Sequence, residues 1–170
     1  MQENELIRTN DIRSQVTFFL LFLTSDACLE ACDEIMPREK LAFELCRIWF
    51  DEIYAPGQSY LESIKGDFSP EDVEAFEEAF EVEELIDLER FHHFFELRMK
   101  MLAEKYKRDS SFPDNDMWRN LTRSAAHVLK EIEPNAAQLR SVLEEKVETA
   151  VRQRGRLLEG EDWRRLLGNA

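Results

Sequence analysis

The segment from residue 38 to residue 55 is apolar on almost every side if it forms an α-helix. At 100° per residue its apolar side chains spread over an arc of roughly 240°. Only Glu44, Arg47 and Asp51 form a narrow polar strip. Such a helix has almost no face to offer to water, so it must be covered by the rest of its domain or by another subunit. This requirement restricts the fold more than any other feature of the sequence.

Residues 82–107 carry a second excess of apolar side chains. One stripe faces the expected core, and a separate stripe consists of Phe94, Leu97 and Met101. Two stripes on one helix indicate two packing partners. If the chain itself does not cover Phe94, Leu97 and Met101, a second copy would cover them. We therefore expect self-association as a homodimer through these three residues.

The remaining segments also fit helices, because strict alternation of apolar and polar residues is not found along the sequence. The run Val16–Leu23 also fits a buried strand, but it has no partner strand and its leucines favour a helix. We expect an all-α, single-domain bundle of six to eight helices over residues 1–170, with 38–55 and 82–107 at its centre and 159–170 as at most a loosely attached tail. The expected helices cover residues 5–23, 26–36, 38–55, 70–80, 82–107, 115–133, 135–158 and 161–167.

Two of these helices have recognisable start signals. Ser69 can accept hydrogen bonds from first-turn amides, and Pro70 suits the first helical position. Asn135 with Gln138 three residues later resembles a capping box, which would start the helix at residue 135.

Composition limits the compartment and the partners. The longest apolar run, eight residues, is far short of the ~18 that a membrane helix needs, so we expect no membrane segment. Three cysteines, Cys28, Cys32 and Cys46, cannot all pair within one chain, and we expect reduced core thiols in a cytoplasmic protein. A net charge of −14 repels phosphate backbones and argues against a nucleic-acid partner.

Most of the negative charge lies in one stretch. Residues 67–96 contain 12 acidic residues and one basic residue, Arg90, which gives a net charge of −11. Within it, the helix 70–80 has an apolar stripe surrounded by carboxylates. This pattern predicts either a solvated face or a docking surface for a basic protein partner. The docking residues would be Glu71, Glu74, Glu77 and Glu78.

The candidate metal ligands are Glu89, His92 and Glu96, whose spacing places them on one flank of the helix 82–107. Glu-x-x-His is the pair that di-iron bundles use to bring a carboxylate oxygen and an imidazole nitrogen to one ion. A complete site of that kind needs a second copy of the pair, which the sequence does not contain. Without a second pair, Glu52 or Glu44 would have to face these three residues to complete a metal site. Because only half of the motif is present, the simpler interpretation is a boundary histidine held by a neighbouring glutamate.

Glu52 is the second unusual residue, because the helical projection places it inside the apolar arc of 38–55. A carboxylate in such surroundings has a raised pKa or a dedicated partner, and an arginine or His92 would be the expected partner. The simpler interpretation is that it reaches water over the helix end, because Pro56 follows four residues later.

The sequence contains no glycine-rich phosphate loop, nucleophile elbow or zinc-protease motif. We therefore favour a non-catalytic, cytoplasmic helical bundle that acts through protein–protein contacts, and we expect no cofactor. The alternative is a helical protein that binds a metal or a small ligand at a Glu/His site inside the bundle, either as a binding protein or as an enzyme. A third hypothesis is an apolar-ligand pocket lined by Trp49, Phe91 and Phe95.

Overall fold

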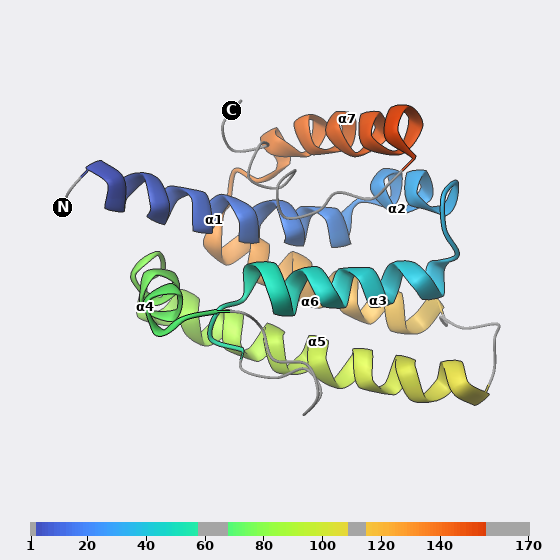
Figure 1. Ribbon diagram of the computed structural model, residues 1–170, viewed down its shortest axis with the longest axis horizontal. Helices are drawn as coiled ribbons and strands as arrows, with labels where there is room; N and C mark the ends of the chain where they lie inside the picture. Colours follow the sequence, from blue (N-terminus) through green and yellow to red (C-terminus); the bar gives the residue numbers. More distant parts are fainter. Residues whose placement is uncertain (1–2, 58–67, 109–114, 156–170) are drawn as a thin grey trace.

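The computed structural model describes residues 3–57, 68–108 and 115–155, with the side chains of most of them, and all regular structure in these ranges is helical (Figure 1). The all-α prediction is therefore confirmed. The helices are α1 (Glu3–Thr24), α2 (Asp26–Asp33), α3 (Arg38–Ile48), a π-helical turn η1 (Trp49–Ile53), α4 (Pro70–Glu78), α5 (Val82–Arg108), α6 (Asn115–Ile132) and α7 (Ala137–Arg154). The expected helix 161–167 and the expected tail 159–170 lie outside the described residues.

Helix α1 occupies the centre of the bundle, although we expected 38–55 and 82–107 there. It packs against α6, α7, α2, α4 and η1, and in Figure 1 it runs between α7 on one side and α5 and α6 on the other. All eight residues of Val16–Leu23 are buried. Eight consecutive apolar or small residues cover every side of two helical turns, so this part of α1 can be surrounded completely.

Helix α3 and η1 are covered mainly by their own chain. Leu41, Leu45, Trp49 and Phe50 are all buried, whereas Phe43 is 39% exposed. α3 and η1 form the layer between α1 and α5, and Trp49 and Phe95 lie in contact there, with ring centroids 6.1 Å apart. The apolar arc of this segment thus mostly needs no second subunit.

The two predicted helix starts differ in outcome. α4 begins as expected: the Ser69 hydroxyl accepts from the Asp72 amide, the Asp72 carboxylate accepts from the Ser69 amide, and Pro70 is the first helical residue. The predicted capping box at Asn135 is wrong. α7 begins at Ala137 with Ala136 as its N-cap, and no side chain caps it. The residues after Pro134 form a turn instead.

Arg13 joins four helices at one point. Its guanidinium donates two hydrogen bonds to the carboxylate of Glu84 on α5, at 2.8 and 3.0 Å. It also donates to the carbonyl of Ala79 after α4 and to that of Ile132 at the end of α6, both at 3.0 Å. A planar guanidinium can make these bonds at once because its five N–H groups form a fixed fork.

None of the described helices is by itself both long and apolar enough to cross a membrane; Asp11–Thr24 and Asp26–Asp33 pass that test only as a pair bent by 75°.

Candidate functional site

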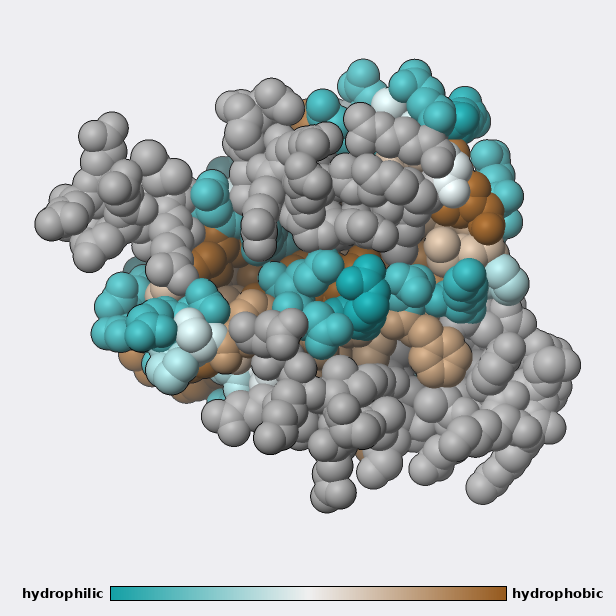
Figure 2. Space-filling view, viewed as in Figure 1, coloured by the Kyte–Doolittle hydropathy of each residue, from teal (hydrophilic) through white to brown (hydrophobic). Residues whose placement is uncertain are grey.

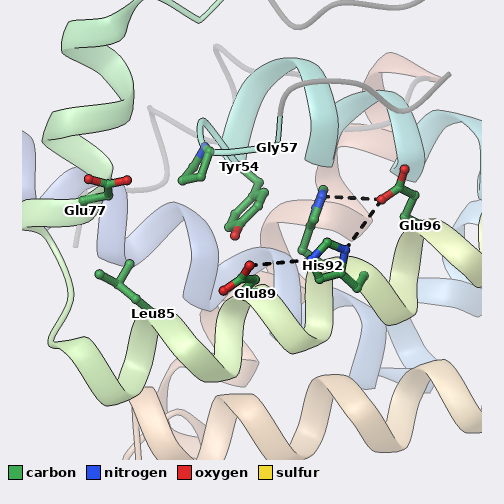
Figure 3. A pocket seen from close by; sticks show the side chains of 9 residues that line it. Tyr54, Gly57, Glu77, Leu85, Glu89, His92 and Glu96 are labelled. Carbon is green, nitrogen blue, oxygen red and sulfur yellow. Dashed lines mark ion pairs between the residues drawn. The ribbon is translucent and has the colours of Figure 1, made fainter. Parts of the chain in front are cut away.

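A pocket of about 430 Å³ opens between the end of η1, the C-terminal half of α4 and the first half of α5 (Figure 3). A pocket of this size can hold a small organic molecule or part of a partner protein. It is lined by Tyr54, Pro56, Gly57, Glu77, Leu85, Glu89, His92, His93 and Glu96.

The π-helical turn brings Tyr54 to this pocket. The Tyr54 amide donates to the carbonyl of Trp49, five residues earlier, at 2.8 Å. A π-turn inserts one extra residue into a helix and changes the direction of the side chains that follow; such turns recur at functional sites. Tyr54 consequently lies against His92, with ring centroids 4.4 Å apart and planes 27° apart.

His92 is buried among aromatic rings and is neutral at pH 7. Burial, together with the neighbouring His93, lowers the pKa of His92 to about 4. Its Nδ1 accepts a hydrogen bond from the indole Nε1 of Trp49 at 3.2 Å, and the Phe50 ring packs edge-on at 5.1 Å.

The bond from Trp49 fixes the position of the His92 proton. An indole N–H can only donate, so Nδ1 must be the unprotonated nitrogen of the neutral ring and Nε2 must carry the hydrogen. Nε2 lies on the pocket side, 3.7 Å from Oε2 of Glu96, which is longer than a hydrogen bond. His92 therefore presents an N–H donor without a close acceptor among the described residues.

Three carboxylates line the same pocket. Glu77 comes from α4, and Glu89 and Glu96 come from α5 (Figure 3). Glu89 lies 3.6 Å from His93 Nε2, and Glu96 lies 3.9 Å from His93 Nδ1. None of the three forms an ion pair with an arginine or lysine in the part of the chain that the structure describes. The pocket is therefore acidic.

Tyr54 supplies a second neutral polar group. Burial, followed by the charges of Glu89 and Glu77, raises the pKa of Tyr54 to about 12, so its hydroxyl keeps the proton. The negative charges of Glu77 on α4 and Glu89 on α5 thus both favour the protonated form of the Tyr54 hydroxyl.

Gly57 lines the pocket, and its backbone lies very close to the rings of His92 and Tyr54. A Cβ atom at this position would lie 2.6 Å from Cε1 of His92 and 2.9 Å from Cδ1 of Tyr54. Only glycine allows the backbone to approach these two rings so closely.

The three predicted metal ligands line one pocket, but Glu89 lies beside His93 rather than His92. His92, His93 and Glu96 form a group whose potential ligand atoms all lie within 4.8 Å of one another. A histidine that binds a metal is deprotonated at the ligating nitrogen and usually donates from the other one. With Nδ1 accepting from Trp49, Nε2 could bind a metal only if that hydrogen bond broke or the ring became an anion. The geometry of His92 thus disfavours a metal at Nε2.

Glu44 and Glu52 do not face His92. Both pair with Arg47, at 3.2 and 3.1 Å respectively. Glu52 lines another pocket of about 260 Å³ between α1, η1 and α4. Its expected arginine partner is therefore present, and the partner is Arg47.

The other predicted residues are dispersed. Phe94 is half-buried against the core with the Arg98 guanidinium 4.8 Å from its ring centroid, and Leu97 is 56% exposed. The side chain of Met101 lies outside the described residues. Trp49 and Phe91, from the hypothetical apolar-ligand pocket, pack against each other with centroids 5.2 Å apart. Glu71, Glu74, Glu77 and Glu78 are all exposed on α4.

Sequence reasoning missed Tyr54, Gly57 and His93 as pocket residues. Glu89 and His93 are four residues apart, a helical spacing that could have identified the pair. Neither the Trp49–His92 bond nor the contact of Gly57 with His92 has a local signal, because each joins segments far apart in the sequence.

No protein-family model, curated protein or solved structure matches this chain.

Proposed function

We propose that this protein is a non-catalytic protein-binding module whose acidic face docks a basic partner protein. The acidic face consists of exposed carboxylates on α4 and at the start of α5: Glu71, Glu74, Glu77, Glu78, Glu81 and Glu83. On the surface drawn in Figure 2, hydrophilic residues cover the end of the molecule where α4 lies in Figure 1.

One observation carries this proposal: the carboxylates of the acidic face have no cationic partner among the described residues, whereas nearby arginines are already in use. Arg13 binds Glu84, and Arg90 lies 3.8 Å from Asp87. Like charges gathered on one surface repel one another, and a partner of opposite charge relieves that repulsion and is attracted from a distance. The three cysteines are buried as thiols, which supports a cytoplasmic location.

The test compares two charge variants of equal net charge. A fluorescein-labelled lysine- and arginine-rich peptide is titrated with the wild type, with Glu74→Gln/Glu78→Gln on α4, and with Glu30→Gln/Glu145→Gln on α2 and α7. All four glutamates are exposed. We expect the α4 variant to bind about tenfold more weakly and the control to bind as the wild type does, with affinity falling as salt rises. Equal weakening in both variants would contradict the proposal, because it would reflect net charge alone.

A further inference from the structure

The pocket around His92 adjoins the acidic face, because Glu77 belongs to both. It also differs from an ordinary cluster of surface acids. The His92 side chain is only 7% exposed, and its Nε2–H points into the pocket without a hydrogen-bond acceptor among the described residues. The nearest carboxylate oxygen, Oε2 of Glu96, lies 3.7 Å away, so a ligand oxygen placed closer would accept this hydrogen bond.

The carboxylates define the other half of the ligand. Glu77 and Glu89 line the pocket from α4 and α5 respectively, the negative charges of both act on the Tyr54 hydroxyl, and neither forms an ion pair with an arginine or lysine in the described ranges. A cation in the pocket would be attracted by both carboxylates. A guanidinium suits this position better than an ammonium, because its planar fork can donate in two directions at once.

We propose that this pocket binds one arginine side chain of the basic partner, with the guanidinium between Glu77 and Glu89 and a peptide carbonyl beside it accepting from His92 Nε2. The inference rests on the proposed function, since it assigns the anchoring residue of the same partner. Tyr54 offers the cation its hydroxyl rather than its face, because it is stacked on His92 and, at 5.1 Å, on Trp49. Leu85 and Pro56 provide apolar wall for the methylene groups of the arginine.

The charge variants for the test remove two charges from the same two helices. Glu77→Gln/Glu89→Gln alters the pocket, whereas Glu78→Gln/Glu83→Gln alters only the neighbouring surface. All four side chains are exposed, so both variants should fold. Each is titrated with a basic peptide that contains one central arginine, and with the same peptide carrying citrulline, which keeps the shape but not the charge, or lysine at that position.

We expect the wild type and the surface variant to bind the arginine peptide about tenfold more tightly than the citrulline peptide, with the lysine peptide in between. The pocket variant should lose this preference. Nitrogen NMR of the His92 ring should report a change at Nε2 when the arginine peptide binds and a smaller change with citrulline.

Three results would overturn the inference. An arginine preference that is equal in all three proteins, or a His92 ring that does not respond, would place the arginine elsewhere while leaving the acidic face as a docking surface. If arginine amide alone binds as tightly as the peptide, the pocket serves a small organic cation instead of a partner protein. Failure of the docking surface itself is recognised separately, by equal effects of the α4 and the α2/α7 variants described above.

Discussion

At the scale of single residues, the most informative group is a histidine held neutral by its surroundings. His92 receives a hydrogen bond from Trp49 at Nδ1, stacks on Tyr54 and lies under Gly57. These contacts leave Nε2–H as the only polar atom that His92 offers to the pocket. The protein thereby places a neutral donor in a pocket that Glu77, Glu89 and Glu96 also line.

Burial of His92 should make the free energy of unfolding depend on pH. The pKa of His92 is lowered to about 4 in the folded chain, against about 6.5 when unfolded, so the unfolded state binds the proton first as pH falls. The stability that His92 contributes is complete above pH 6.5 and decreases between about pH 6.5 and pH 4, by about 3 kcal/mol in total.

Urea unfolding at several pH values, compared with His92→Gln, measures this contribution. The variant keeps a polar side chain at the site but cannot titrate, so its stability should fall less steeply over the same interval. Parallel curves for the two proteins would show that His92 has an ordinary pKa in the folded state.

At the scale of elements, local chemistry explains where α4 begins but not where α7 does, and packing explains how the helices end and combine. Ser69 and Pro70 start α4 as expected because all the partners lie within one turn. The end of α3 could not be predicted, because the projection assumed an α-helix through residue 55. Glu52 pairs with Arg47, five residues away, and this spacing belongs to the π-turn rather than to an α-helix.

The Arg13 junction should stabilise the packing of α1 against α4, α5 and α6. Arg13→Lys keeps the charge, but one ammonium cannot reach Glu84 and both carbonyls in the same geometry. We expect a loss of about 1–3 kcal/mol in the free energy of unfolding, measured with urea. Arg123→Lys, at an exposed position on α6, is the matched control and should change stability by less than about 0.5 kcal/mol. Similar losses in both variants would show that the junction adds nothing to stability.

At the scale of the whole molecule, the sequence predicted the fold class well and the site only in part. Helical periodicity identified the apolar surfaces, because periodicity depends on neighbours within one helix. It placed Glu89, His92 and Glu96 on one flank of α5, and all three line the pocket. It could not reveal that Trp49 donates to His92, because 43 residues separate them and their contact depends on the packing of α3 against α5.

Self-association stays a prediction, and the exposed Leu97 is the residue with which to test it. In one chain α3 is largely covered, so the remaining apolar surface on α5 is the expected contact between copies. Light scattering after size exclusion should give a dimer of the 20.1 kDa chain, which Leu97→Lys converts to a monomer and Val142→Lys, on exposed α7 surface, does not. A wild type that is monomeric throughout would remove this expectation.

The π-turn η1 makes the spacing of its residues as important as their identity. A five-residue turn is one residue longer than the geometry of a regular α-helix requires. The turn absorbs this residue, so the side chains after it lie about 100° around the axis from where the same sequence would place them on a regular α-helix. If the turn relaxed to an α-helix of the same number of residues, Tyr54 would turn away from the imidazole even though no aromatic residue had been lost. A homologous chain that lacks the extra residue could instead form a regular helix and keep its tyrosine at the pocket, so an alignment of such chains should show single-residue gaps at this turn.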